Sequence, residues 1–356
     1  MASTDIPQDT QDGLDHTMVR FVHHEDGTPL GFIAIHRGTK EHPAFGATRV
    51  FEYPTVTAAS NDALRLGRLM SYKNAFASTR YGGGKGVILM TREDQENPDR
   101  RAHLLARYAQ EVNKLGGAFV TGADVGVNMD DVRLLRAHSP YIVGISRDPV
   151  FHTVRGVLAA LRAALQVRFG DTDMSKYSYS ILGAGKVGWG IIAHLSQAGA
   201  RHIIASDIDP AVLERLRSEY PDVLLVSPEE LLHAPVDVFV PCAMGGILNT
   251  ETIAHLQAKV IVGAANNQLA DLSIGDRLHS SQVLYVPDYV ANGGGVMSVI
   301  NEYEQHSDEA LDEKVGAIEQ TVLQILKTSA QEDIPPHRIA DRIAEERIAS
   351  LFPRLS

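Results

Sequence analysis

Cysteine is almost absent from this sequence of 356 residues, in which Cys242 is the only one. A single cysteine excludes an internal disulfide framework and favours a reducing compartment. No apolar run approaches the roughly 18 residues that a membrane-spanning helix needs. The polar, acidic N-terminus also lacks the basic and apolar segments of a signal peptide. We therefore expect a cytoplasmic protein.

Positive charge is in deficit, with 33 Lys and Arg residues against 44 Asp and Glu, a formal net charge of −11. A chain this acidic repels phosphate backbones, so neither a nucleic-acid nor a membrane partner is expected. The histidines are scattered without the spacing of metal ligands, and no H-E-x-x-H motif occurs. We therefore expect no metal site.

The length fits two domains, and the pattern of apolar residues changes near residue 148. Before that point the sequence mixes helices, predicted at 57–78 and 99–115, with short strands, predicted at 17–22, 31–37, 86–90 and 118–121. A helix is predicted at 153–169, and from residue 177 strands and helices alternate strictly. Such alternation predicts a parallel sheet with crossover helices. We therefore predict an α/β protein with two α/β domains and a helical C-terminal region.

The segment from Gly183 to Gly188 reads G-x-G-x-x-G in the context that gives this motif its meaning. It follows an apolar strand and opens a helix, and the next strand ends in Asp207, 19 residues after Gly188. Gly183 would permit the tight turn, Gly185 the approach of a pyrophosphate, and Gly188 the close packing of helix on strand. Asp207 would accept hydrogen bonds from the adenosine ribose and repel a 2′-phosphate, so we expect NAD rather than NADP. A glycine-rich turn without a ligand is the alternative.

Two lysines and an aspartate stand out in the first domain. Lys73 lies late in an apolar helix, Lys85 follows three glycines, and Asp124 comes directly after a short strand. A P-loop is excluded because Thr79 and Gly86 stand where that motif needs glycine and Ser or Thr. We expect the glycines to bend the backbone so that Lys85 enters a cleft. The alternatives are a solvated Lys73, a turn lysine at Lys85 and a loop or N-cap aspartate at Asp124.

A few polar residues in the second domain are weaker candidates. Asn266 and Asn267 follow a predicted strand and offer amides to a nicotinamide or to a substrate amine, and Asn292 is a similar candidate before a run of glycines. Cys242 is interpreted as a small residue at a strand end and not as a nucleophile. His152 has no role that the sequence suggests.

Several short segments occur in the order found in the glutamate/leucine/phenylalanine/valine dehydrogenases. They are Pro43-Ala44-Phe45-Gly46 with Arg49, Met70-x-x-Lys73, Gly82-Gly83-Gly84-Lys85, Thr121-Gly122-x-Asp124-Val125, the glycine fingerprint, Pro241-Cys242-Ala243, Gly263-Ala264-Ala265-Asn266-Asn267 and Pro287-Asp288-Tyr289. The sequence resembles this family over roughly residues 20–350, and most of all its leucine, phenylalanine and tryptophan dehydrogenase branch.

The resemblance implies NAD-dependent oxidative deamination of an L-amino acid to a 2-oxo acid and ammonia. It implies a substrate-binding and catalytic domain at residues 1–148 and an NAD-binding Rossmann domain, doubly wound, at 149–324, separated by a cleft. The C-terminal helices, about 325–356, would pack back on the first domain. Lys73 would pair with the substrate carboxylate, Lys85 would be the catalytic lysine with a lowered pKa, and Asp124 would take and return protons.

The resemblance also assigns binding residues. Substrate would contact Phe45, Gly46, Ala47, Met70, Asn267, Asn292, Val296 and Val299. The cofactor would contact Gly183, Gly185, Lys186, Val187, Gly188, Asp207, Ile208, Cys242, Ala243, Ala265, Asn266 and Asn292. A homo-oligomer, with a dimer favoured, is also implied.

Substrate preference follows from three apolar positions. Phe45 stands where the glutamate enzymes have a lysine, and an apolar ring does not compensate a buried carboxylate. With Val296 and Val299 also apolar, we expect a large apolar or aromatic substrate, with tryptophan or phenylalanine ahead of leucine and valine. Ala47 and Gly293 depart from the family pattern, which affects rate and range more than reaction type. The alternatives are a non-catalytic NAD-binding sensor or biosynthetic partner, and an enzyme that runs mainly in reductive amination or uses another amine.

Overall fold

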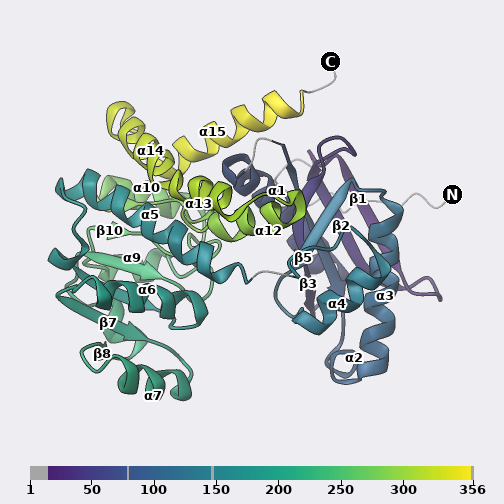
Figure 1. Ribbon diagram of the computed structural model, residues 1–356, viewed down its shortest axis with the longest axis horizontal. Coiled ribbons are helices and arrows are strands. Elements are labelled where there is room, and N and C mark those ends of the chain that lie inside the picture. Colours follow the sequence, from purple (N-terminus) through teal and green to yellow (C-terminus); the bar gives the residue numbers. More distant parts are fainter. Residues whose placement is uncertain (1–14, 78–79, 146–147, 354–356) are drawn as a thin grey trace. The chain divides into compact units, whose positions relative to one another are not determined.

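The computed structural model describes residues 15–77, 80–145 and 148–353. The chain divides into two compact units. The first comprises residues up to 147 together with 302–304 and the chain from 344 onward, and the second comprises 148–301 and 305–343. In Figure 1 the first unit is drawn mainly in purple and blue and the second mainly in teal and green. Among the helices of these described residues, none is long and apolar enough to cross a membrane.

The first unit is built on a mixed five-stranded sheet in the order β1-β2-β4-β3-β5. Its strands are β1 (Met18–His23), β2 (Pro29–Arg37), β3 (Ala44–Phe51), β4 (Gly82–Leu89) and β5 (Phe119–Ala123). Its helices are α1 (Val56–Ala77), α2 (Arg92–Glu96), α3 (Pro98–Lys114) and α4 (Met129–His138). Strands β1, β2 and β4 pair antiparallel, whereas β3 pairs parallel with both β4 and β5. The first unit was predicted to be an α/β domain, but strand β3 was not among the predicted strands.

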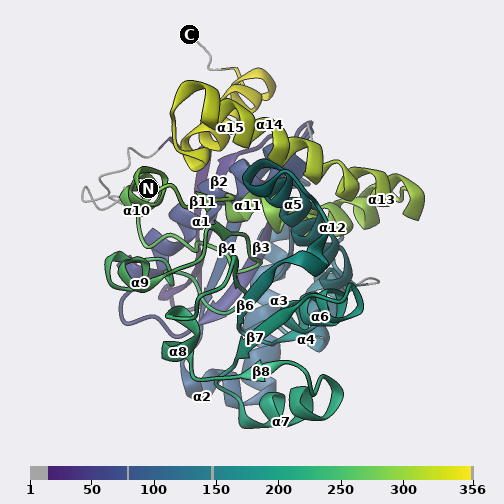
Figure 2. The ribbon, with the colours of Figure 1, turned by 90° about the vertical axis from the view of Figure 1, so that its left-hand side faces the viewer.

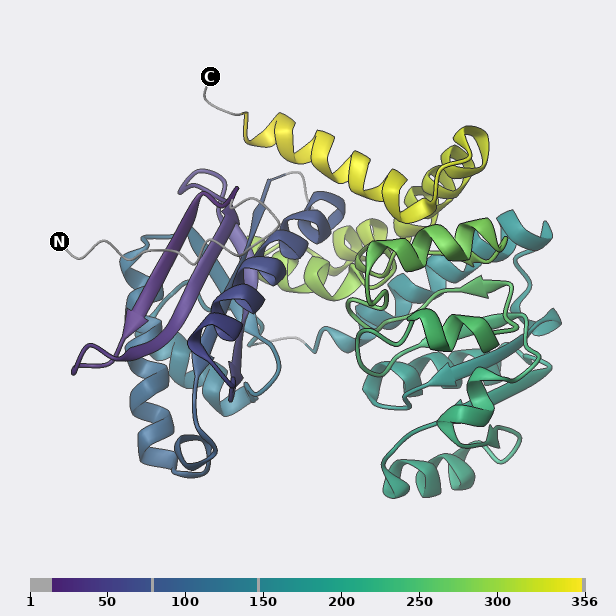
Figure 3. The same ribbon diagram turned by 180° about the vertical axis from the view of Figure 1, so that it is seen from behind.

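Alternate residues of these strands face opposite layers of helix. Phe32, Ala34 and Val87 pack with α1 on one face, and Figure 3 shows α1 running across that face. Ile33 and Ile35 belong to the core that includes α3 and α4 on the other face. The period of two in a strand therefore decides which side chains lie under α1.

The glycine cluster before Lys85 is not the bend that the sequence suggested. Gly82, Gly83 and Gly84 lie inside strand β4. A Cβ on Gly83 would stand 2.0 Å from the backbone nitrogen of Ser71 in α1, and one on Gly84 would stand 3.0 Å from a ring carbon of Phe119. Gly83 is needed because α1 lies too close to β4 for a side chain, and Gly84 is needed because the ring of Phe119 occupies the space on the other face.

The second unit holds six parallel strands in the order β11-β10-β9-β6-β7-β8, and Figure 2 shows β6, β7 and β8 side by side. The strands are β6 (Ser178–Leu182), β7 (His202–Ser206), β8 (Leu224–Leu225), β9 (Val238–Pro241), β10 (Val260–Ile261) and β11 (Leu284–Tyr285). In chain order this is the 3-2-1-4-5-6 arrangement of doubly wound folds, which reverses direction between β6 and β9. The prediction of a Rossmann-type parallel sheet is confirmed.

Helices cover both faces of this sheet, with α5 and α6 on one side and α9 and α10 on the other. They are α5 (Val150–Phe169), α6 (Lys186–Gln197), α7 (Pro210–Glu219), α8 (Pro228–Leu232), α9 (Thr250–His255), α10 (Leu272–Ser280), α11 (Asp288–Ala291), α12 (Gly294–Glu304), α13 (Asp308–Gly316), α14 (Ile318–Glu332) and α15 (Pro336–Leu351).

The C-terminal helices divide differently from the expectation that residues from about 325 pack on the first domain. All of α14 and the part of α15 up to Ile343 belong to the second unit, and only the chain from Ala344 onward belongs to the first. Helix α14 buries Val322 and Ile325 fully and packs on α5, where Arg162 forms an ion pair with Glu319 at 2.8 Å. The apolar side of α14 therefore completes the second unit's core.

Candidate active site

Lys85 lies in the middle of the first sheet, on the face that α1 covers. It is opposite Ala34 of β2 and in register with Ala47 of β3, and only 4% of it is exposed. Its Nζ donates a hydrogen bond to Oδ2 of Asp124 at 2.7 Å. Burial lowers the pKa of Lys85 below its usual 10.5, against the opposing effect of Asp124. Because Lys85 is buried, its amine loses its proton at a lower pH than a lysine in water does.

Asp124 follows the last residue of β5, as the sequence predicted, and is half-buried. Its Oδ2 accepts hydrogen bonds from both Lys85 Nζ and Arg49 Nε, the latter at 2.8 Å. Burial raises the pKa of this carboxyl, but Lys85 and Arg49 outweigh that effect and bring the pKa to about 2. Asp124 is therefore ionised at neutral pH, and it becomes a stronger base only when one of the two cations withdraws.

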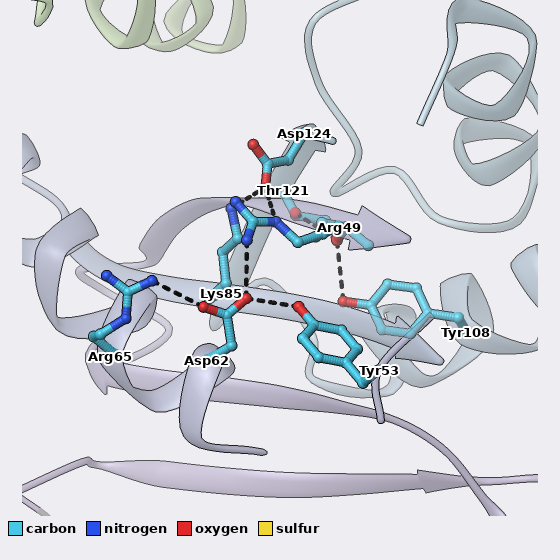
Figure 4. Close-up of polar contacts among 9 residues, drawn as sticks. Arg49, Tyr53, Asp62, Arg65, Lys85, Tyr108, Thr121 and Asp124 are labelled. Atoms are coloured by element: carbon cyan, nitrogen blue, oxygen red, sulfur yellow. Dashed lines mark hydrogen bonds and ion pairs between the residues drawn. The ribbon is translucent and has the colours of Figure 1, made fainter. Parts of the chain in front are cut away.

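Arg49 is the functional residue for which the sequence reasoning found no role. It lies on β3 and joins two carboxylates, since its Nη1 also donates to Oδ2 of Asp62 at 2.9 Å. Asp62, on α1, further accepts from Tyr53 at 2.6 Å and from Arg65 at 3.0 Å. Figure 4 shows the resulting row of side chains from Asp62 through Arg49 to Asp124 and Lys85. The only available signal was its place after Pro43-Ala44-Phe45-Gly46 among the segments that resemble the family.

The opposite face of the same strands is held by a buried hydroxyl network. Thr48 Oγ1 lies 3.1 Å from the hydroxyl of Tyr108 and 2.9 Å from that of Thr121, as Figure 4 also shows. Gly86, next to Lys85, leaves room for it, because a Cβ there would stand 1.9 Å from the Tyr108 oxygen. The network joins β3 to β5 beneath Lys85 and Asp124.

The predicted substrate residues of the first unit lie on the same two elements. Lys73 and Met70 are half-buried on α1, and Gly46 and half-buried Ala47 lie on β3. Gly46 admits no side chain, since a Cβ would stand 1.9 Å from the carbonyl oxygen of Gly84.

Phe45 is more enclosed than the sequence suggested, at 1% exposure. Its ring lies 5.4 Å from that of Tyr81 and 5.8 Å from that of Tyr303, measured between centroids. Sequence reasoning missed both tyrosines. Val296 and Val299 are half-buried on α12, in the second unit.

The glycine fingerprint of the second unit has the geometry that its spacing predicts. Gly183 has a φ of +94°, and a Cβ on Gly188 would stand 2.0 Å from the carbonyl oxygen of Gly183. Around Gly185, by contrast, a Cβ would meet no described atom within 4 Å. Helix α6 begins directly after it at Lys186 and Val187. The position at which the motif predicts a phosphate is therefore open, and it lies at the N-terminus of α6.

Asp207 directly follows β7 and is fixed beside this turn, since its carboxylate accepts from Ala184 N at 2.7 Å and from Asp209 N at 3.0 Å. The next residue, Ile208, is 90% exposed. Ala243 is also exposed, and burial raises the pKa of the Cys242 thiol to about 12, which argues against a nucleophilic thiolate there.

The asparagine candidates gather at the carboxyl ends of β10 and β11. Asn292 Nδ2 donates to Ala264 O at 3.0 Å and to Asn266 Oδ1 at 2.9 Å, while Asn267 has a φ of +54° and donates its N–H to Asp288. Ala265 is buried beside them. Asn292 is 3% exposed, and no donor among the described residues reaches its Oδ1. A buried acceptor of this kind fits an amide donor such as that of a nicotinamide.

His152, on α5, lies 3.8 Å from Asp312 through Nε2, which assigns it no part in the site. No group of three or more His, Cys, Asp or Glu side chains in the described ranges is arranged to hold a metal ion.

The doubly wound sheet, its fingerprint and the acidic residue after the second strand define a nucleotide-binding α/β protein, here joined to a unit with a buried lysine–aspartate pair. Two family models match: Glu/Leu/Phe/Val dehydrogenase, dimerisation domain, over residues 16–140, and Glutamate/Leucine/Phenylalanine/Valine dehydrogenase over residues 214–352. The chain belongs to this family, and it is therefore an amino acid dehydrogenase, an oxidoreductase acting on a CH–NH2 group.

Individual relatives differ in the amino acid of their names. The chain is 37% identical to L-tryptophan dehydrogenase of Nostoc punctiforme, over 95% of this chain and 94% of the relative. It is 34% identical to leucine dehydrogenase of Bacillus subtilis, over 94% and 92%. The crystal structure of the Nostoc punctiforme enzyme superposes with a TM-score of 0.82, covering 95% of this chain and 97% of that one.

Proposed function

We propose that the protein catalyses the reversible, NAD-dependent oxidative deamination of a large apolar or aromatic L-amino acid to the 2-oxo acid and ammonia. Tryptophan and phenylalanine are placed slightly ahead of leucine and valine. The observation that carries the proposal is the buried Lys85 amine held 2.7 Å from the Asp124 carboxylate. This pair would supply one base for the attacking water and another for the substrate ammonium. The first unit would bind substrate, and the second would bind NAD.

The overall reaction converts the amino acid, NAD⁺ and water into the 2-oxo acid, NH4⁺, NADH and a proton. NAD, when bound, accepts the hydride from Cα. Lys73, on α1, would hold the substrate carboxylate as a cation. Asp124 would take a proton from the substrate ammonium, so that the nitrogen lone pair can form the iminium as the hydride leaves.

Lys85 would act on the water. In its neutral form it would remove a proton as the water oxygen attacks the iminium carbon, and the resulting ammonium would stabilise the new hydroxyl oxygen. Asp124 would then return its proton to the nitrogen. As the C–N bond breaks and ammonia leaves, the hydroxyl oxygen becomes the carbonyl of the 2-oxo acid, and its proton passes to the ionised Asp124. Lys85 helps to hold the pKa of Asp124 low in the present ion pair. Asp124 would therefore take up a proton only when Lys85 Nζ turns away from it toward the water.

The choice of NAD over NADP rests on Asp207. Its carboxylate is fixed by two backbone N–H groups beside the glycine turn, where it would bind ribose hydroxyls and repel a 2′-phosphate. The fingerprint residues, with Ile208, Ala243, Ala265 and Asn266, would line the bound dinucleotide.

The substrate class rests on Phe45 and on the two valines of α12, Val296 and Val299. Phe45 is enclosed by aromatic rings, so a charged substrate side chain would find no compensating group there. The Nostoc and Bacillus relatives are named for tryptophan and leucine, which agrees with an apolar preference. We also propose a homo-oligomer, with a dimer favoured, since the family model of the first unit is described as a dimerisation domain.

The test is NADH formation with a panel of L-amino acids at alkaline pH, run with NAD and with NADP. We expect the large apolar and aromatic substrates to be fastest and Lys85→Ala to lose most of the rate. Fastest turnover of glutamate would overturn the pocket argument. Because Trp189, directly after the fingerprint, is the only tryptophan, energy transfer from it to NADH reports binding separately. NADH binding without turnover of any amino acid would favour the non-catalytic alternative.

A further inference from the structure

We propose that Arg49 is a positioning residue: held by Asp62 of α1, it takes a share of the Asp124 carboxylate, so that Lys85 need not stay charged to satisfy that carboxylate. The inference rests on the proposed function, in which a neutral Lys85 is the base. It assigns a purpose to the two residues of the first unit, Arg49 and Asp62, that the reaction scheme leaves unused.

The geometry couples the two cations directly. Arg49 Nε and Lys85 Nζ donate to the same oxygen, Asp124 Oδ2, at 2.8 and 2.7 Å. Figure 4 shows the other carboxylate oxygen of Asp124 pointing away from both cations. The two oxygens thus have different surroundings. Oδ2 holds the cations, and Oδ1 is the oxygen that we assign to proton exchange with the substrate amine.

Asp62 fixes the guanidinium from the other side. Its Oδ2 accepts from Arg49 Nη1 at 2.9 Å and from the Tyr53 hydroxyl at 2.6 Å, while Arg65 binds Oδ1 at 3.0 Å. Only 15% of the Asp62 side chain and 22% of the Arg49 side chain are exposed. An arginine bound at both ends in this way presents its Nε to Asp124 without the freedom of a long surface side chain.

The charges explain why a third group is needed. If Lys85 and Asp124 formed an isolated pair, deprotonation of the amine would leave a half-buried carboxylate with no cation, which is unfavourable. With Arg49 in place, Asp124 keeps a cation when Lys85 becomes neutral. Arg49 also acts on Lys85 itself, since like charges at short range favour the neutral amine.

The elements packed against Lys85 carry further titratable groups. Strand β2 places Ala34 opposite Lys85, and farther along β2 the ring of His36 bonds Ser71 of α1, where burial lowers the pKa of His36 to about 3. His36 is therefore uncharged above pH 4. The charged groups that act on Lys85 come from β5 (Asp124), β3 (Arg49) and α1 (Asp62), and Lys73 of α1 lies three turns from Asp62 on the same side of that helix.

The test measures the pKa of Lys85 without relying on activity. The chain has nine lysines, so protein labelled with 13C-lysine gives few Cε signals, and Lys85→Arg assigns the relevant one. In Arg49→Gln we expect the pKa of Lys85 to rise by about one unit or more, and the pH at which kcat/KM levels off to rise equally. Arg49→Lys, which keeps the charge but not the double attachment, should restore most of the pKa and less of kcat.

A matched control is Arg101→Gln, which breaks an equally enclosed ion pair, Arg101 with Asp131 at 2.6 Å, on the other face of the sheet. It should leave the pKa of Lys85 unchanged. If Arg49→Gln does not fold, Asp62→Asn loosens the same guanidinium and should lower kcat with little change in KM. A Lys85 pKa that stays within about 0.3 unit in Arg49→Gln overturns the proposal, as does an unchanged kcat in Asp62→Asn where Arg49→Gln does not fold. A raised pKa in a protein that turns over no amino acid would support the positioning role and overturn the proposed function instead.

Discussion

The carboxylate at the end of β7 makes a quantitative prediction about the cofactor. Asp207 is anchored by the backbone N–H groups of Ala184 and Asp209 at 2.7 and 3.0 Å, so it cannot swing away from a bound nucleotide. NADP carries a phosphate on the ribose hydroxyl that an acidic residue in this place binds in NAD. The perturbation is Asp207→Asn, which removes the charge and keeps an oxygen that can accept from Ala184.

The magnitude follows from Coulomb's law. Two unit charges about 4 Å apart repel by ~1 kcal/mol in water and ~4 kcal/mol at an effective dielectric constant of 20. Asp207 is half-buried, so its repulsion of a phosphate falls between these limits, and about 1.4 kcal/mol is a factor of ten. We expect the wild type to prefer NAD by roughly 5- to 700-fold in kcat/KM, and the variant to prefer it by less than about fivefold.

The assay compares kcat/KM for NAD and NADP with one amino acid. The control is Asp209→Asn, which removes the same charge two residues away, at a side chain that caps α7 through Ala211 N at 2.8 Å. Since asparagine caps a helix as well as aspartate does, this variant should keep the wild-type ratio. An unchanged ratio in Asp207→Asn would refute the reasoning, as would a wild type that uses both cofactors equally.

Two further predictions concern stability. Above pH 4, ionised Asp124 stabilises the folded state by about 2 kcal/mol, because its pKa is lowered from 3.8 to about 2, and this contribution is lost as the pH falls from 4 to 2. Urea unfolding across that range should show a shallower loss of unfolding free energy in Asp124→Asn, and parallel losses would contradict the ion pair. Gly86→Ala would place a Cβ 1.9 Å from the Tyr108 hydroxyl oxygen and should lower the free energy of unfolding by ~1–3 kcal/mol. Tyr108→Phe removes that oxygen, so a double-mutant cycle without coupling would show that the contact is misplaced.

The second unit was predictable from sequence because its signals are local. The strict alternation predicted from residue 177 is confirmed, since α6, α7 and α8 each separate two strands of the parallel sheet. Each strand is a short apolar run, several helices begin at a recognisable cap such as Asp209 with Pro210, and the fingerprint marks the first turn. These features depend on neighbours in the chain and need no knowledge of distant contacts.

The first unit was less predictable because its structure depends on contacts between residues that are distant in the chain. The glycines before Lys85 were interpreted as a bend from their local preference. In the structure they are required by residues distant in the chain, such as Ser71 beside Gly83 and Phe119 beside Gly84. Strand β3 was not predicted because its glycine, alanine and arginine residues show little apolar alternation.

The site shows the same contrast between single residues and their partners. Lys85 and Asp124 were found one by one, but the contact between Arg49 and Asp124 spans 75 positions of the chain. No local pattern in a single sequence reports a pairing of that kind.

The central claim is that the buried amine of Lys85 moves protons in an amino acid deaminase. The most direct measurement is the pH dependence of kcat/KM for NADH formation with the best L-amino acid, with the ammonia released measured in parallel, in the wild type and in Lys85→Ala. We expect one NH4⁺ per NADH, a rise of tenfold per pH unit up to a pKa that lies below the usual 10.5, and a loss of 10²- to 10⁴-fold in the variant, the ~2–4 orders of magnitude typical of a general base. A variant that keeps its rate within tenfold of the wild type, with the same pH profile, would contradict the account.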